Sequence, residues 1–265
     1  MKVLGIAGSP RRERGLSHQV VNRILEGAQA AGAETELLYL IDSEPEYCIH
    51  CGHSCFEDGI CAQEDAATLR STSVDGADAI VIAAPVYCWQ PNGLTTAFFD
   101  KLRLSGGPWN RDTPNGCKAL GVAVAGGTGS GVFTALQSIY AWLCLWKFRP
   151  LDPLPVTRFN LAQVLEDAPG LGEALAQSSR EPFESVADLM LRYDGLPTMD
   201  FGRVDEFRWL AQEVLKGLEA RGDAPEAVGH IHGLLETAAA LRTAGSTQAE
   251  AQWIVQAYQI GAAAW

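Results

Sequence analysis

A cysteine-rich segment is the part of the sequence best equipped for chemistry. Four of the seven cysteines lie within residues 48–61, with the spacing C-x2-C-x3-C-x5-C. They are Cys48, Cys51, Cys55 and Cys61. Thiolates are soft ligands that bind strongly, and four of them in one loop can hold an iron–sulfur cluster or a metal ion. The segment therefore predicts a cluster or metal site, with His50 and His53 as reserve ligands.

The composition restricts the classes of protein that fit. The chain has 265 residues, of which 47% are hydrophobic and 20% charged, so we expect one large domain, or one domain with an appendage, around an ordinary core. The net charge of −12 argues against nucleic acid or an anionic membrane as partner, because like charges repel. We find no secretory signal and no apolar run of the ~20 residues that span a membrane. These features indicate a cytoplasmic protein.

The cysteine spacing leaves the occupant of the segment open. Structural zinc sites usually place two C-x2-C pairs well apart, and only Cys48 and Cys51 form such a pair here. We favour a 4Fe-4S cluster over zinc and over an empty loop. A disulfide knot is disfavoured, because the cysteine count is odd and cytoplasmic thiols stay reduced. Cys88, Cys117 and Cys144 are expected to be buried structural residues.

The elements that must position these groups alternate between strand and helix over the first 156 residues. Apolar runs predict strands at 2–7, 36–40, 79–84, 119–125 and 148–156, and apolar residues at helical spacing predict helices near 20–28, 65–72, 94–102 and 132–143. Short, nearly all-apolar strands between helices are typical of a parallel sheet covered on both faces. The pattern predicts a doubly wound α/β sheet, with right-handed crossovers and ligands beyond the carboxyl ends of the strands.

Residues 157–265 have a different character. The stretch 160–199 is mixed and polar, which predicts short helices joined by loops. Helical patterns follow at 207–218, 228–241 and 247–261, the last opening with a capping box from Thr247 to Glu250. We expect a mostly helical insert and C-terminal extension that packs on the first 156 residues or on a partner subunit.

Three loops follow strand ends, where the ligand should bind. In residues 8–18, glycines allow close approach of the backbone and a helix start offers free N–H groups, so the loop suits a phosphate. The alternative is a polar turn in which Ser17 is an ordinary N-cap. In residues 84–93, Tyr87 and Trp89 could wall a planar ring or belong to the core. Residues 126–131 are glycine-rich, and form a ligand loop or a flexible turn. Together the three loops match flavin mononucleotide (FMN).

These segments resemble a known family. Gly8-Ser-Pro-Arg11, with Gly15 and Ser17, resembles the phosphate loop of the flavodoxin-like NAD(P)H-dependent FMN reductases, and residues 84–101 are similar to a second segment of that family. The cysteine run through Asp65 resembles the iron–sulfur flavoprotein subgroup. The resemblance covers about residues 1–155, with the helix at 207–218 as the last helix of the fold. The chain departs from the family pattern at Leu16, Thr96 and Lys101, and by one extra residue between the second and third cysteines.

The resemblance implies a fold and a set of ligand contacts. The fold is a flavodoxin-like, five-stranded parallel sheet in the order 2-1-3-4-5, with residues 1–156 as the FMN-binding domain and 157–265 as the extension. The four cysteines of 48–61 would hold a 4Fe-4S cluster. No side chain is assigned a catalytic role. The implied FMN contacts are Ser9, Arg11, Gly15, Ser17, Pro85, Val86, Tyr87, Trp89, Gly126, Gly127 and Gly129.

The resemblance also implies a function. It is an FMN-dependent oxidoreductase that transfers electrons from NAD(P)H or a protein donor to a small organic acceptor. The alternatives are a non-enzymatic electron carrier, a cluster-free NAD(P)H:quinone or flavin reductase, and a fold that has lost its flavin. The implied partners are a small-molecule acceptor or a redox protein, and the implied assembly is a homodimer or homotetramer.

Overall fold

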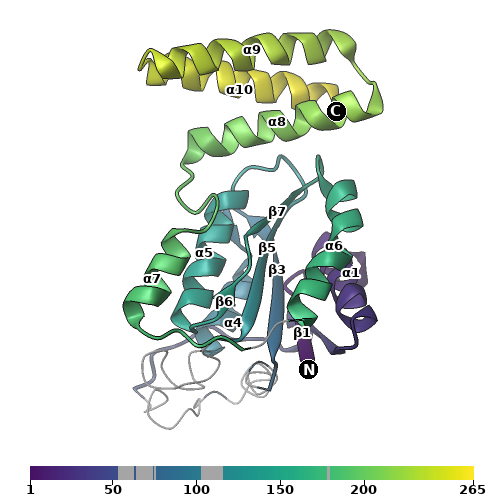
Figure 1. The fold of residues 1–265 in the computed structure, drawn as a ribbon, viewed down its shortest axis with the longest axis vertical. Coiled ribbons are helices and arrows are strands. Elements are labelled where there is room, and N and C mark those ends of the chain that lie inside the picture. Colours follow the sequence, from purple (N-terminus) through teal and green to yellow (C-terminus); the bar gives the residue numbers. More distant parts are fainter. Residues whose placement is uncertain (53–62, 64–73, 75, 103–115, 178–179) are drawn as a thin grey trace.

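The molecule consists of a mainly parallel sheet between two layers of helices, with a further layer of three helices across one edge (Figure 1). The computed structural model describes residues 1–52, 63, 74, 76–102, 116–177 and 180–265. The helix predicted at 65–72 lies outside these residues. No helix within the described ranges is long and apolar enough to cross a membrane.

The sheet confirms the doubly wound class. Its strands are β1 (Lys2–Ala7), β2 (Glu34–Tyr39), β3 (Ala79–Tyr87), β5 (Lys118–Ala125), β6 (Arg149–Pro150) and β7 (Leu154–Thr157), to which the short β4 (Gln90–Pro91) is added. The order is β2-β1-β3-β5-β6, all parallel, with β7 also pairing with β5. The prediction of five strands was therefore incomplete. The fifth position is divided between β6 and β7 around Pro153, which has no N–H to donate, and β4 pairs with β3 in antiparallel fashion.

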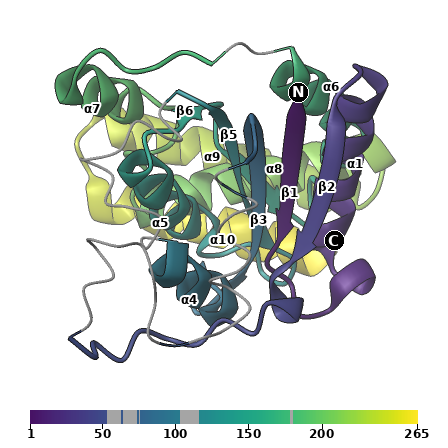
Figure 2. The ribbon, with the colours of Figure 1, turned by 90° about the horizontal axis from the view of Figure 1, so that it is seen from below.

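Helices cover both faces of the sheet. On one side lie α1 (Leu16–Ala30) and α6 (Leu161–Ala176), and on the other α4 (Gly93–Leu102), α5 (Val132–Leu145) and α7 (Val186–Asp194), as Figures 1 and 2 show. Glycines let α1 and α6 approach closely: a Cβ added to Gly172 would lie 1.9 Å from the Ile24 carbonyl oxygen. The last helix of the doubly wound fold is therefore α6, and the prediction that 207–218 fills this place was wrong.

The remaining helices form the extension. They are α8 (Arg203–Arg221), α9 (Pro225–Thr243) and α10 (Thr247–Ala264), and they lie across the carboxyl ends of the strands (Figure 1). They have a core of their own, which includes Leu210, Val214 and Ile231. Phe159, just after β7, joins this core and connects it to the sheet. The extension therefore lies over the sheet edge at which the ligand loops were predicted.

Candidate functional site

Two adjoining cavities open at the carboxyl edge of the sheet. The first has a volume of about 360 Å³ and is lined by Ser9, Arg11, Gly15, Leu16, Ser17, Pro85, Val86, Tyr87, Val124, Gly126 and Gly127. The second, of about 210 Å³, is lined by Val86, Cys88, Trp89, Ala125, Gly127, Thr128, Gly129 and Ser130. Every residue predicted to contact the flavin lines one cavity or the other, and Val86 and Gly127 line both. The structure therefore brings the three predicted loops together, while the roles of these residues as ligands stay predictions.

The β1–α1 loop forms a polar recess at one end of the first cavity. Ser9 and Ser17 are 4% and 1% exposed. The Oγ of Ser9 accepts a hydrogen bond from the Arg11 N–H at 3.2 Å, whereas the buried Oγ of Ser17 has no hydrogen-bond partner among the described residues. A Cβ added to Gly15 would lie 2.4 Å from the Ser9 Oγ, so only glycine leaves the recess open. Buried hydroxyls normally find a partner, and the exception at Ser17 calls for an explanation.

The start of α1 supplies further donors to this recess. The N-cap of α1 is Gly15, which has no side chain to cap the helix. Ser17 lies inside the helix, so the interpretation of Ser17 as an ordinary N-cap was wrong. The first N–H groups of a helix lack intrahelical acceptors and lie at the positive end of its dipole. The recess therefore combines free backbone donors, a free hydroxyl and a favourable potential for an anion.

Two of the three arginines of the loop, Arg11 and Arg12, have different surroundings. Arg11 is exposed and lines the first cavity. Arg12 forms an ion pair with Asp42, just beyond β2, and has a left-handed φ of 48°. Its guanidinium is thus already paired with a carboxylate. Of the two arginines, Arg11 is therefore the one that lies at the first cavity, where the recess is.

The turn between β3 and β4 presents two aromatic side chains. Cys88 and Trp89 have φ values of 49° and 67°, the left-handed conformation of a two-residue type I′ turn. Tyr87 is 49% exposed and therefore does not belong to the core. Cys88 is also exposed, so the prediction that it is buried was wrong: it occupies the tip of the turn. Cys117 is buried, as predicted, and Cys144 is half-buried.

A buried hydrogen-bond network joins the first two loops. Asn92 donates from Nδ2 to the Gly8 carbonyl oxygen at 2.9 Å. Its backbone N–H donates to the Pro85 carbonyl oxygen at 3.0 Å. Thr95 in turn donates to Asn92 Oδ1 at 2.6 Å. A Cβ on Gly8 would lie 2.3 Å from Thr95 Oγ1, so the approach requires glycine. The sequence analysis missed Asn92 and Thr95, because their role depends on a partner 84 residues away.

The glycine loop at 126–131 is packed on several sides. Gly129 and Gly131 have φ values of 84° and 87°, which side-chain-bearing residues rarely adopt. A Cβ on Gly131 would lie 2.5 Å from the Trp89 Cα, and one on Gly129 would lie 2.6 Å from Leu210 Cδ2. Glu206 accepts hydrogen bonds from the N–H of Gly131 and of Phe133. These contacts disfavour the interpretation of the loop as a flexible turn.

The cysteine segment is only partly described. Cys48 is half-buried and Cys51 exposed, and the Cys48 Sγ accepts a hydrogen bond from the His50 N–H at 3.4 Å. Cys55, Cys61 and His53 lie outside the described residues. Within the described ranges, no group of three or more His, Cys, Asp or Glu side chains is placed to hold a metal ion. The four-cysteine ligand set therefore stays a prediction.

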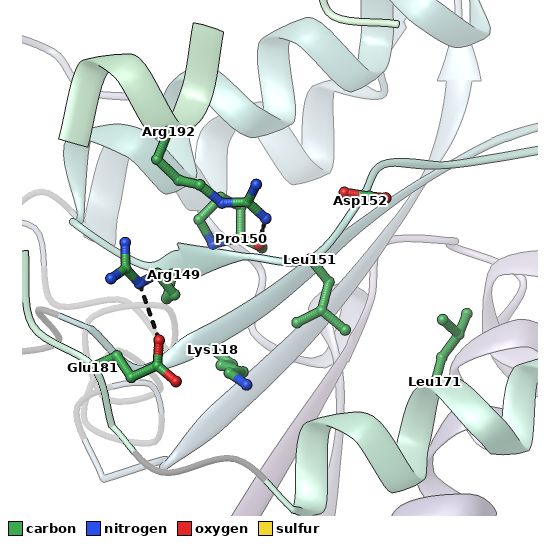
Figure 3. A pocket seen from close by; sticks show the side chains of 8 residues that line it. All are labelled: Lys118, Arg149, Pro150, Leu151, Asp152, Leu171, Glu181 and Arg192. Carbon is green, nitrogen blue, oxygen red and sulfur yellow. Dashed lines mark hydrogen bonds and ion pairs between the residues drawn. The ribbon is translucent and has the colours of Figure 1, made fainter. Parts of the chain in front are cut away.

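A larger cavity, of about 520 Å³, lies where β5 and β6 begin, away from the predicted ligand loops (Figure 3). Two of its three basic residues already contact other protein groups. Arg149 faces Glu181 at 3.5 Å, and Arg192 donates to the Pro150 carbonyl oxygen at 2.8 Å. None of the residues predicted to contact the flavin lines this cavity. The ligand site is therefore better assigned to the carboxyl edge, where doubly wound sheets bind their ligands.

When the antiparallel β4 is left out of the count, the parallel strands have the order 2-1-3-4-5. This order, with a ligand recess at the carboxyl edge of the sheet, defines a flavodoxin-like α/β protein. Residues 1–154 match the sequence model of the NADPH-dependent FMN reductase family. The chain belongs to this family, and it is a flavin-dependent oxidoreductase of the iron–sulfur flavoprotein group.

Curated relatives support this assignment, and a solved structure supports the fold. An iron–sulfur flavoprotein of Methanosarcina thermophila is 30% identical over 143 residues, which are 54% of this chain and 73% of that protein. One from Archaeoglobus fulgidus is 30% identical over 129 residues, 49% of this chain and 56% of that protein, so the chain spans only about half of that relative. The structure of an NAD(P)H:quinone oxidoreductase from Methanothermobacter marburgensis, 18% identical, aligns with a TM-score of 0.53 over 68% of this chain and 98% of that one, which supports the fold.

Proposed function

We propose that the chain binds FMN across the two adjoining cavities and passes electrons from NAD(P)H or a protein donor to a small organic acceptor. The observation that carries the proposal is the buried Ser17 Oγ, which has no hydrogen-bond partner among the described residues and lies in a recess with Ser9, Arg11 and Gly15. Leaving a buried hydroxyl unpaired costs about 1–3 kcal/mol. A phosphate oxygen in the recess would remove this cost, and the start of α1 would stabilise the negative charge.

The other walls suit the ring of the flavin. Pro85, Val86 and Tyr87 line the first cavity on the β3 side, and Gly126 and Gly127 line it from the end of β5. The two cavities together fall in the range of about 300–1,000 Å³ that is usual for small-molecule sites. FMN, when bound, supplies hydride and one-electron transfer. The residues named here bind it, orient it and keep water from its covered face.

We also propose that Cys48, Cys51, Cys55 and Cys61 hold a 4Fe-4S cluster. The relatives from Methanosarcina and Archaeoglobus are named iron–sulfur flavoproteins. The hydrogen bond from the His50 N–H to the Cys48 Sγ is of the kind that tunes cluster sulfurs in proteins. The spacing supports the same ligand set, since four thiolates within fourteen residues can reach one cluster.

An absorption spectrum of the full-length protein, purified without oxygen, tests both cofactors. Flavin bands with a broad added shoulder near ~400 nm that bleaches on reduction are expected, together with about four iron and four sulfide per chain. Flavin bands alone would reject the cluster. A colourless protein that also fails to quench the fluorescence of added FMN would reject the flavin.

Turnover distinguishes an enzyme from an electron carrier. We expect the protein to oxidise NADH or NADPH when a quinone or free flavin is supplied as acceptor. The control is the S17A variant, which should lose turnover at low FMN concentration and regain it when FMN is added. A wild-type protein that is reduced only by a protein donor or dithionite, and by neither nucleotide, would instead be a carrier.

A further inference from the structure

The helical extension holds the glycine loop by hydrogen bonds at its middle, at Thr128, and at its C-terminal end, at Gly131. Near the start of α8, the Glu206 side chain is 2% exposed, and its two carboxylate oxygens accept from the Gly131 N–H at 2.8 Å and the Phe133 N–H at 3.0 Å. On α10, the Tyr258 hydroxyl donates to the Thr128 carbonyl oxygen at 2.5 Å. Both helices lie beyond residue 154, where the match to the family ends.

Apolar contacts hold the same loop between α8 and the β3–β4 turn. Leu210 of α8 lies directly over Gly129, and Trp89 of the turn lies directly over Gly131. The Arg203 guanidinium, at the start of α8, lies 5.5 Å from the centre of the Trp89 ring. The extension and the turn thus both pack against the loop.

The two helices that carry these side chains, α8 and α10, are connected by an ion pair. Arg208 of α8 forms ion pairs with Asp205 on the same helix, at 2.7 Å, and with Glu250 on α10. Burial raises the pKa of the Tyr258 phenol, which keeps its proton on the oxygen that faces Thr128. Glu206 and Tyr258 therefore act from one connected helical unit.

We propose that α8–α10 form a clamp that holds residues 126–131 in the conformation that receives the flavin ring, with Glu206 as the positioning residue. The inference rests on the proposed binding of FMN at this edge. A glycine-rich loop has many conformations when free, and selecting one costs conformational entropy. If only a fraction of molecules has the competent loop, the apparent Kd rises by the inverse of that fraction. The clamp keeps that fraction near one.

The E206Q variant tests the clamp. The glutamine keeps the size of the side chain, but its amide nitrogen faces an N–H group and cannot accept from it. The control is E219Q on the same helix, where the glutamate pairs with His232 in an exposed position. The full-length apo-proteins are titrated with FMN and with riboflavin, and flavin fluorescence is followed.

We expect E206Q to weaken the binding of both flavins by the same factor, about tenfold or ~1.4 kcal/mol, and E219Q to bind as the wild type does. Riboflavin lacks the phosphate, so an equal loss of affinity for both flavins assigns the effect to the ring end of the site. Unchanged affinity in E206Q, or a loss for FMN alone, would overturn the clamp. If the wild type bound neither flavin, the proposed function itself would be overturned, and the clamp with it. This outcome is distinct from a wild type that binds flavin and an E206Q variant that binds it equally well.

A second variant guards against misfolding of E206Q. Y258F removes only the hydroxyl that donates to Thr128 and keeps the ring that packs against Phe159 and Phe207. We expect about threefold weaker binding of both flavins, with the wild-type circular dichroism spectrum. A folded Y258F protein that binds both flavins like the wild type, beside an E206Q protein that does not fold, would overturn the clamp and leave Glu206 a purely structural role.

Discussion

The two ends of the proposed flavin site are stabilised in different ways. At the phosphate end, Ser9, Arg11, Gly15 and Ser17 come from one short loop and the first turn of the helix that follows. At the ring end, residues 126–131 depend on partners far away in the chain: Glu206 lies 75 positions from Gly131. The first end is built by local backbone geometry, and the second by tertiary packing. A substitution at the phosphate end should therefore weaken binding without much loss of stability, whereas one at the ring end should weaken binding and lower stability together.

The largest effect is expected from G131A at the ring end. The left-handed φ of Gly131 costs a side-chain-bearing residue about 1–2 kcal/mol, and the new Cβ would lie 2.5 Å from the Trp89 Cα, a backbone atom that cannot rotate away. We expect the free energy of unfolding to fall by about 3 kcal/mol and the affinity for both flavins to fall at least about 100-fold. Urea unfolding and fluorescence titration measure the two effects.

The control for G131A is G93A. Gly93 begins α4, and among the described residues no heavy atom lies within 4 Å of its added Cβ. We expect its stability to stay within about 0.5 kcal/mol of the wild type. If G131A proved as stable as G93A, the tight packing of the ring end would be disproved.

The difference between the two ends also explains what the sequence could predict. The segment Gly8–His18 carries its own information, because glycines, hydroxyls and a helix start within one loop favour an anion whatever the rest of the chain does. The alternation of strands and helices was enough to bring the other two loops to the same edge. Glu206 was missed because the sequence of its own helix gives no sign that its carboxylate accepts a hydrogen bond from Gly131, 75 positions earlier. Short helices joined by loops were predicted for 160–199, but the length of α6 and its place as the last helix of the fold were missed, because Pro169 and Gly172 weaken a helical pattern. Gly172 nevertheless allows the close contact with α1.

A smaller and more selective effect is expected from G15A at the phosphate end. The new Cβ would lie 2.4 Å from the Ser9 Oγ and 2.8 Å from the Ser9 Cβ, so it would fill the recess. We expect about 50-fold weaker binding of FMN, unchanged binding of riboflavin, and a change in stability below about 1 kcal/mol. Titrations with both flavins check this result. An equal loss of affinity for both flavins would show that the β1–α1 loop also shapes the ring end. The contrast between the phosphate end and the ring end would then be wrong.

S17A should separate binding from stability within the phosphate end. Removing a buried hydroxyl that has no partner among the described residues relieves a cost in the apo-protein, and alanine is the better helix former, so we expect a gain of about 0.5–1 kcal/mol in stability. The affinity for FMN should fall about tenfold, since a hydrogen bond to a charged phosphate is lost, and that for riboflavin should not change.

The matched control for S17A is S138A on α5. Ser138 also lies in a helix, but its hydroxyl donates to Gln90 at 2.7 Å. We expect the S138A protein to be less stable than the S17A protein by about 0.5 kcal/mol or more, because S138A removes a hydrogen bond that is present in the structure. If S17A destabilised the apo-protein as much as S138A does, Ser17 would have a partner in solution, and the argument for an anion site would lose its main support.

The smallest effect is expected at Cys88, which lines the second cavity. Its thiol is exposed and lines this cavity, whereas burial raises the pKa of the Cys117 thiol. The thiolate is the reactive form, so at about pH 8 iodoacetamide should modify Cys88 quickly and Cys117 slowly, and the rate at Cys117 should rise further as the pH increases. Bound FMN should slow the modification of Cys88 about threefold by covering the cavity, and leave Cys117 unaffected, as read from peptide masses over time. A rate at Cys88 that does not respond to FMN would confine the flavin to the first cavity. The clamped loop would then contact the flavin only through Gly126 and Gly127, which line the first cavity.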